Sequence, residues 1–185
     1  MCGRYFISDD AIEAFDIDAL NRVDGGAEIC PGMEAPVVLS PDSSATFMRW
    51  GFEREQGGLV INARAETMAE KPMFRKLTTA QRCAMPASRY FEWRRSDRQK
   101  YAIDLAGTGL FWLAGLWRVG DSKNEFVVLT QPPVAAVEPI HSRMPLLLPN
   151  RQALVRWFGG EVPVFTDSRA IRLAAQGPEQ LQMIF

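Results

Sequence analysis

The chain has 185 residues, of which 47% are hydrophobic and 23% charged, a composition typical of one globular domain. Its formal net charge of −1 excludes the overall positive charge expected of a general nucleic-acid binder, so any polyanion must be held by local arginines. The three cysteines form no CxxC pair and there is only one histidine, so no metal site is expected. The N-terminus lacks a basic start followed by an apolar run, and no apolar stretch reaches membrane-spanning length. We therefore expect a cytoplasmic protein with free thiols.

The first half of the chain predicts short strands and two helices. Residues 2–8 alternate aromatic or β-branched residues with polar ones and predict a strand. Residues 8–20 begin with serine and two acids and carry apolar residues at helical spacing, which predicts an amphipathic helix. A loop leads into a strand over 30–40, strands are predicted over 45–53 and 59–66, and a helix is predicted over 72–81 after a proline.

The second half predicts a run of strands and one late helix. Strand-like runs flank a proline over 82–93, three successive strands follow over 99–105, 110–119 and 125–131, a helix is predicted over 150–158 and a short edge segment over 162–167. No repeat or linker interrupts the chain. The fold class expected is α+β, one domain over 1–185 whose sheet is mostly antiparallel.

Cys2 follows the initiating methionine directly. Removal of Met1 is expected because residue 2 is small, and it would leave an α-amine and a thiol on adjacent carbons. Their reference pKa values are about 8 and about 8.5, so both are partly nucleophilic near neutral pH. Such a pair adds to an aldehyde as a Schiff base and then closes to a thiazolidine. The alternative is a small strand residue near the terminus with no chemical role.

Three further segments place polar residues where chemistry is possible. Asn62, in VINARAET, lies inside a predicted strand, where asparagine is unfavourable without a polar task, and Arg64 and Glu66 fall on its face by the two-residue period. Glu92 lies between Phe91 and Trp93, and this apolar setting is expected to raise its pKa into the range of a general acid or base. Each segment has an alternative reading: a structural network for the first, a solvated edge carboxylate for the second.

His141 is the only histidine and lies in the polar segment HSRM between apolar runs. If the segment is extended, His141 and Arg143 share a strand face, and the arginine cation is expected to lower the histidine pKa. A lone histidine is otherwise commonly a structural residue. Arg4, Arg64, Arg75 and Arg143 all lie in or near these segments and form the expected local anion-binding cluster.

The blocks MCGRY, INARAET, RCAMPASRYFEW, LAGLW and IHSRMPLLL resemble, in order, the signature of the SRAP family of SOS-response-associated peptidases, also described as abasic-site processing proteins. The resemblance covers the chain from Met1 to about Leu148 and implies a single SRAP domain with a barrel-like β core and flanking helices. It implies an N-terminal cysteine that forms a thiazolidine crosslink with abasic sites in single-stranded DNA, without metal or cofactor, in a monomer that associates with the nucleoid when bound to DNA. Autocatalytic, peptidase-like N-terminal processing is also implied.

Carried over by position, the resemblance assigns chemistry to Cys2, Asn62, Glu92 and His141. It assigns DNA contact to a second set of residues, in which the tryptophans stack on bases: Arg4, Trp50, Arg64, Arg75, Trp93, Arg143 and Met144. Two segments depart from the family pattern. The usual WGLIPxW block reads WGFEREQGG, which removes a proline and a tryptophan from the expected DNA surface. Glu28 stands where asparagine is usual, and its carboxylate is expected to repel a phosphate.

Two alternatives from other classes stay open. In an N-terminal-nucleophile peptidase or amidase, Cys2 would attack an amide with its own amine as base, and an oxyanion hole would be needed. In a non-covalent single-stranded DNA-binding module, the cysteine would be inert.

Overall fold

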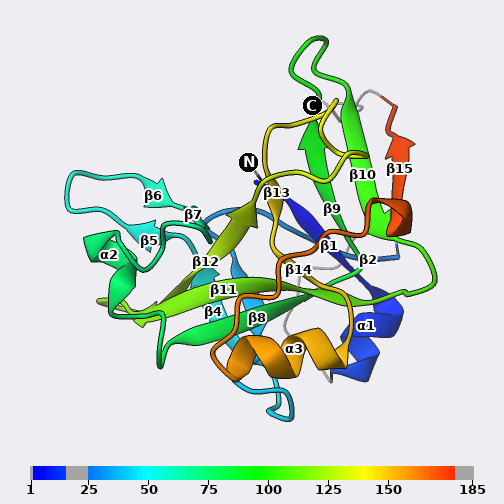
Figure 1. Cartoon of the computed structure of the whole chain (residues 1–185). Helices are drawn as coiled ribbons and strands as arrows, with labels where there is room; N and C mark the ends of the chain where they lie inside the picture. The colour runs from blue at the N-terminus through cyan, green and yellow to red at the C-terminus, as the bar shows by residue number, and fades with distance from the viewer. Residues whose placement is uncertain (1, 16–24, 178–185) are drawn as a thin grey trace, which may run out of the picture.

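The computed structural model describes residues 2–15 and 25–177 (Figure 1). The helices are α1 (Asp9–Ala14), α2 (Pro72–Arg75) and α3 (Arg151–Phe158), with a 3₁₀ turn η1 (Ser168–Ala170). The strands are β1 (Tyr5–Ser8), β2 (Gly26–Ile29), β3 (Glu34–Val37), β4 (Thr46–Trp50), β5 (Phe52–Glu53), β6 (Leu59–Val60), β7 (Asn62–Arg64), β8 (Arg82–Ala87), β9 (Arg89–Trp93), β10 (Lys100–Leu105), β11 (Phe111–Val119), β12 (Asn124–Gln131), β13 (Met144–Pro145), β14 (Leu147–Leu148) and β15 (Ile171–Ala175).

The strands form two main sheets. One runs β15-β10-β9-β1-β2, and the other joins eight strands around β11 and β12, while β5 and β6 make a separate hairpin. Within the described part of the chain, strand pairings are antiparallel except those of β12 with β4 and with β7. The mostly antiparallel, nearly closed barrel-like core with flanking helices confirms the predicted α+β class.

Strand β12 explains how one sheet separates two apolar cores. Its side chains alternate between faces, so Phe126 and Val128 enter one cluster while Val127 and Leu129 enter the other. The first cluster fills the space between the two sheets. The second lies on the outer face of the eight-stranded sheet, where Trp157 of α3 covers it. A strand buried on both faces reads as a continuous apolar run, which is what residues 126–129 show.

Helices α1 and α3 begin at residues whose side chains cap them. The Ser8 side chain accepts a hydrogen bond from the Ala11 amide at the start of α1, and the Asn150 side chain accepts one from the Ala153 amide at the start of α3. The helix predicted over 8–20 is described only to residue 15, so its later part lies outside the described residues. The helix predicted over 72–81 is wrong beyond Arg75, since the following residues form turns.

Three other predictions need correction. Residues 162–167 form no strand; the edge strand is β15, which follows them after the η1 turn and pairs with β10. Strand β2 was not predicted, yet it pairs with β1 over its whole length. Glu66 lies beyond the end of β7, and His141–Arg143 are not extended because β13 begins only at Met144.

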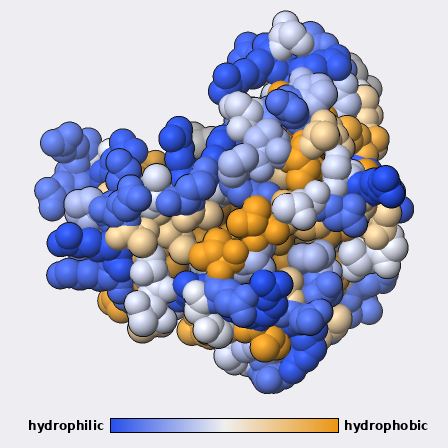
Figure 2. All heavy atoms as spheres, in the orientation of Figure 1, coloured by the Kyte–Doolittle hydropathy of each residue, from blue (hydrophilic) through white to orange (hydrophobic). Residues whose placement is uncertain are grey.

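The arrangement leaves one face of the molecule concave. In Figure 1 an arm made of β5, β6 and α2 extends to the left and the β9–β10 hairpin extends upward, and β1 starts near the corner between them. Figure 2 shows the surface hollowed at this corner, with hydrophilic residues covering the ends of both projections. No described helix is long and apolar enough to cross a membrane.

Candidate functional site

The candidate site is built around Cys2, which precedes β1 and is fully buried. Its thiol lies 3.8 Å from the Arg4 carbonyl oxygen, to which it donates a weak hydrogen bond, and its own carbonyl accepts a hydrogen bond from Asn62 Nδ2 at 2.8 Å. Burial, and then the negative charge of Glu92, raise the pKa of the Cys2 thiol. The thiol is therefore held in its protonated form in this environment.

Glu92 lies on β9, 2% exposed, and burial raises the pKa of its carboxyl from 4.5 to about 7. The sequence predicted the direction of this shift for the wrong reason. Phe91 and Trp93 point to the opposite face of β9, where they pack with Phe6. Glu92 is buried because its own face of the strand turns toward Cys2 and Tyr90, both of which its charge influences.

Asn62 reaches Cys2 because β7 is aligned in parallel with β12, with Asn62 opposite Val128. Its Nδ2 is committed to the Cys2 carbonyl, and its Oδ1 is buried without a hydrogen-bond partner among the described residues. The structure thus brings together three of the four residues assigned to chemistry: Cys2, Asn62 and Glu92.

His141 is half-buried, and its Nδ1 lies 3.0 Å from the Arg143 amide, which can donate to it, and 3.1 Å from the Arg143 carbonyl oxygen, to which a protonated Nδ1 can donate. The two contacts suit different states of the ring: the amide contact leaves the proton of the neutral ring on Nε2, and the carbonyl contact places a proton on Nδ1. Desolvation lowers the pKa of His141, and the charge of Arg95 lowers it further. The predicted direction is found, but its cause differs. The Arg143 guanidinium turns away to Glu66, and the Arg143 backbone contact opposes the shift.

Arg143 is the most firmly held of the predicted DNA contacts. Its guanidinium forms a bidentate ion pair with the Glu66 carboxylate and donates to the Thr130 carbonyl at 2.6 Å. The same hydrogen bonds lower the pKa of Glu66. A phosphate would have to displace Glu66 to reach both nitrogens of this guanidinium.

The other predicted arginines are more open. Arg64 and Arg75 are exposed, on β7 and α2 respectively. Arg4 pairs with Glu28 at 3.0 Å and lies over the Trp93 ring at 5.3 Å, and Lys100 also approaches both of these partners. Glu28 was expected to repel a phosphate. In the structure its carboxylate instead forms an ion pair with Arg4, so a phosphate would have to compete with Glu28 for this guanidinium.

Trp50 and Met144 are core residues, so the structure contradicts their assignment to DNA contact. Both side chains are fully buried, and neither has any exposed surface (0%). Trp50 stacks on Phe126, contacts the Tyr5 ring and donates from Nε1 to the Ile61 carbonyl at 2.9 Å. It has no free face for a base. Trp93, which is partly exposed, keeps that possibility.

Two tyrosines next to the site escaped the sequence analysis. Tyr5 and Tyr90 stand opposite each other in the β1–β9 pairing, and both are fully buried. Burial raises the pKa of each hydroxyl, and the charge of Glu92 adds to the increase at Tyr90. Both hydroxyls lack hydrogen-bond partners among the described residues. The signal was available, since Tyr90 precedes Glu92 by two residues and therefore shares its strand face.

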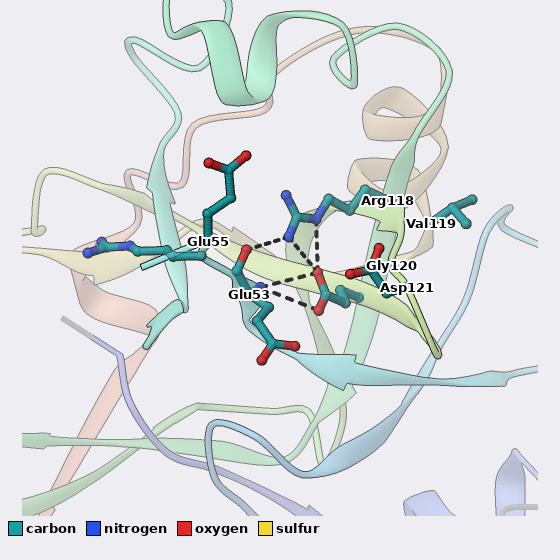
Figure 3. Close-up of a pocket in the computed structure, with 8 residues that line it drawn as sticks. Glu53, Glu55, Arg118, Val119, Gly120 and Asp121 are labelled. Carbon is teal, nitrogen blue, oxygen red and sulfur yellow. Dashed lines mark hydrogen bonds and ion pairs between the residues drawn. The ribbon is translucent and has the colours of Figure 1, made fainter. Parts of the chain in front are cut away.

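A separate pocket, shown in Figure 3, contains none of the residues assigned from the sequence. Arg118 donates from Nε to Glu125 at 2.8 Å and from a terminal nitrogen to the Glu53 carbonyl at 2.7 Å. Glu55 and Asp121 add negative charge to the lining. This pocket is a poor place for a phosphate, because its carboxylates outnumber its cations. Across residues 2–15 and 25–177, no three His, Cys, Asp or Glu side chains gather in a metal-binding cluster.

The fold is mostly β, and a buried cysteine at position 2 is hydrogen-bonded by an asparagine and influenced by the charge of a glutamate. These features define a class of protein with a candidate nucleophile near the N-terminus. Comparison with known proteins makes the class specific. The profile of the SOS response associated peptidase (SRAP) family matches residues 1–183, and the chain belongs to this family.

Several named proteins are similar to this chain in sequence. The abasic site processing protein YoqW of Bacillus subtilis is 33% identical over 170 residues, covering 80% of this chain and 76% of the relative. The abasic site processing protein HMCES of Xenopus tropicalis is 30% identical over 179 residues, covering 72% of this chain and 53% of the relative. A crystal structure of a protein from Bordetella bronchiseptica, 20% identical, superposes with a TM-score of 0.77 over 96% of this chain and 100% of that chain, which shows a shared fold.

Proposed function

We propose that this protein processes abasic sites in single-stranded DNA by capturing the ring-opened sugar aldehyde covalently on Cys2. The observation that carries the proposal is the convergence of Glu92 and the Asn62 amide on the buried Cys2. Relatives named for abasic site processing support the same substrate.

The proposed reaction requires Met1 to be removed first, because a retained methionine ties the Cys2 nitrogen into an amide. The freed amine attacks C1′ of the aldehyde, and the resulting carbinolamine loses one water to give an imine. The Cys2 sulfur then adds to the imine carbon, while the thiol proton passes to the nitrogen. The product is a five-membered thiazolidine, and the balance is loss of one water with no change of oxidation state.

The order of these steps follows from the thiol's environment. Because burial raises the pKa of Cys2, the thiol enters the reaction protonated, and the amine attacks first. Glu92, with a pKa of about 7, can take a proton from the ammonium and return one to the departing hydroxyl at neutral pH. Asn62 fixes the cysteine backbone. Neutral His141, in the tautomer that accepts from the Arg143 amide, offers its Nε2 proton to the sugar oxygen.

The flanking phosphates are assigned to the cations around the concave face. Arg64 is exposed beside Asn62, while Arg4 and Arg143 become available when DNA phosphates replace Glu28 and Glu66. Partly exposed Trp93 offers a ring on which a base can stack. The proposal needs neither metal nor cofactor, and one monomer reacts with one abasic site.

Peptidase-like self-removal of Met1 is the second part of the proposal. In this step the Cys2 thiol attacks the Met1 carbonyl, the C–N bond breaks as the thiol proton passes to the Cys2 nitrogen, and water hydrolyses the resulting thioester to release methionine and restore the thiol. Synthesis of the protein in a cell-free system with methionine aminopeptidase inhibited tests this part. Loss of Met1 by intact mass supports self-processing, and retention of Met1 assigns the removal to a cellular enzyme.

The crosslink itself is tested with a single-stranded oligonucleotide carrying one abasic site. We expect a denaturant-resistant complex whose mass equals the processed protein plus DNA minus one water. Cys2→Ser should give only an imine that needs borohydride to survive, and Cys30→Ser, which changes a thiol elsewhere, should react normally. A stable complex from Cys2→Ser, or active protein that still carries Met1, would refute the thiazolidine. Binding without any covalent product would favour the non-covalent alternative.

A further inference from the structure

A groove lies between the β6–β7 segment and α2, and it borders the candidate site. Its volume is about 760 Å³, within the range of pockets that hold small ligands. Val60, Met73 and Phe74 give it an apolar lining, and 43% of the Met73 surface is exposed.

Positive charge surrounds this apolar lining. Arg54, Arg64 and Lys71 line the groove and are all exposed, whereas no carboxylate of the described residues lines it. An apolar floor with a cationic rim complements a flat apolar ring that is attached to an anion. A nucleotide has this combination, since its base is planar and its phosphate is charged.

Asn62 connects the groove to the candidate site. It lines the groove while its Nδ2 holds the Cys2 carbonyl at 2.8 Å. Its buried Oδ1 has no hydrogen-bond partner among the described residues, and a base N–H would supply one. An occupant of the groove would therefore lie next to whatever reacts with Cys2.

One wall of the groove comes from the segment WGFEREQGG, in which the sequence departs from the family pattern. Residues 52–60 form the β5–β6 hairpin, whose turn is closed by the Arg54 amide donating to the Gly58 carbonyl at 3.1 Å. Gly57 and Gly58 both have φ of +82°, a conformation that favours glycine. This tight turn places Arg54 and Val60 at the groove.

We propose that this groove binds the nucleobase of the nucleotide adjacent to the abasic site, with its phosphate held by Arg54, Arg64 and Lys71. The segment WGFEREQGG lacks the proline and the tryptophan that the family pattern places at the DNA surface. In the proposal, the β5–β6 hairpin and the groove beside it provide a base contact in their place. The inference rests on the proposed function for its choice of DNA.

The test is a cycle that combines a protein change with a DNA change. Met73→Ala is compared with wild type on abasic oligonucleotides whose 5′ or 3′ neighbour is either a normal nucleotide or a base-free tetrahydrofuran. We expect Met73→Ala to slow crosslinking at limiting protein about fivefold on normal DNA, the lower end for a base contact. The loss should vanish when the base on the relevant side is absent. Lys71→Gln should weaken both DNAs alike, because it acts on phosphate.

Leu173→Ala is the matched control, since Leu173 on β15 is an apolar residue with similar exposure, 40%. Two outcomes overturn the groove proposal even if the wild type crosslinks normally. Either Met73→Ala lowers the crosslinking rate equally when the neighbouring base is absent on either side, or it does not lower the rate at all. The same cycle run as equilibrium binding to DNA with an unreactive tetrahydrofuran at the abasic position does not depend on Cys2 chemistry. Absence of coupling there overturns it too, and failure of crosslinking with coupling intact refutes only the proposed reaction.

Discussion

The Asn62 side chain holds the main-chain carbonyl of Cys2 at 2.8 Å across 60 residues of sequence. This hydrogen bond connects the two sheets, because Cys2 precedes β1 of the five-stranded sheet and Asn62 begins β7 of the eight-stranded sheet. A side chain with this task orients the cysteine without taking part in bond formation. It is therefore a positioning residue, and its loss should slow the reaction without removing the nucleophile.

Replacing Asn62 with alanine should reduce the crosslinking rate about two- to tenfold, the worth of one neutral hydrogen bond. The reaction of Cys2 with a small free aldehyde, which needs no positioned sugar, should change less. Asn124→Ala, at an exposed position at the start of β12, is the control. Equal rates for Asn62→Ala and wild type on abasic DNA would show that the hydrogen bond has only a structural role.

Replacing Glu92 with glutamine should stabilise the protein at neutral and alkaline pH. Because the folded-state pKa is raised from 4.5 to about 7, the folded protein binds the proton more tightly than the unfolded chain. The wild type therefore loses stability as pH rises from 4.5 through 7, by on the order of 3 kcal/mol. Urea unfolding at several pH values should show that the free energy of unfolding of Glu92→Gln, relative to wild type, increases across this window. The difference between wild type and Glu70→Gln, a change at an exposed position, should not depend on pH. A gap that is independent of pH would contradict the shift.

The two proposed proton carriers should separate in pH–rate profiles of crosslinking. Glu92→Gln should slow adduct formation and remove a limb near pH 7, whereas His141→Ala should slow it and leave that limb in place. Losses of about 10²–10⁴-fold are usual for such groups. Identical profiles in all three proteins would exclude both residues from the chemistry. Since His141 is the only histidine, its ring resonances in an NMR titration should show directly a pKa below the usual 6.5.

Phosphate binding should make crosslinking sensitive to salt. On single strands each neutralised phosphate contributes about 0.7 to the slope of log affinity against log salt. Arg64→Ala should flatten the slope by about one such contact and leave reactivity toward a small aldehyde unchanged. Arg151→Ala, on α3 and paired with Asp42, should keep the full slope. A rate indifferent to salt in the wild type would argue against a DNA substrate.

Removing the internal carboxylate at Glu28 should strengthen DNA capture. Glu28 pairs with Arg4 at 3.0 Å and approaches Lys100 at 3.9 Å, so it competes with phosphate for both cations. Glu28→Gln should raise the crosslinking rate at limiting protein a few-fold at physiological salt. Glu34→Gln, whose partner Lys123 lies elsewhere, is the matched change. A slower rate for Glu28→Gln would mean that the carboxylate orients Arg4 for binding instead of blocking it.

The sequence predicts much of the sheet because periodicity is local information. The two-sided apolar run of β12 and the caps Ser8 and Asn150 could be identified without a structure. The end of α2 could not: Thr78 and Thr79 disfavour a helix, and a turn buries both Phe74 and Leu77 in the same core. Whether such weak preferences or the predicted periodicity prevails is decided by tertiary packing.

The sequence analysis chose the candidate site residues by residue type, and its errors concern the direction in which side chains point. Trp50 was expected on the surface, although Met48 and Trp50 are two residues apart and so share a face that points into the core. Arg143 was expected to act on His141, yet its guanidinium binds Glu66. Strand β15 depends on pairing with β10, 66 or more residues earlier, which no local pattern encodes. Long-range partners decide which way each charged side chain turns.

The burial of Cys2 also sets a schedule for maturation. Asn62 is brought to it by β12, so the pocket cannot close before residue 131 has left the ribosome. At about 5–20 residues per second this leaves the nascent N-terminus open for on the order of 10 s. If an aminopeptidase performs the proposed removal of Met1, it has to cut within that interval, before folding encloses the cysteine. Self-cleavage could begin only after the interval ends, when Glu92 and Asn62 have arrived. Slowing translation late in the chain would therefore favour the first route and delay the second.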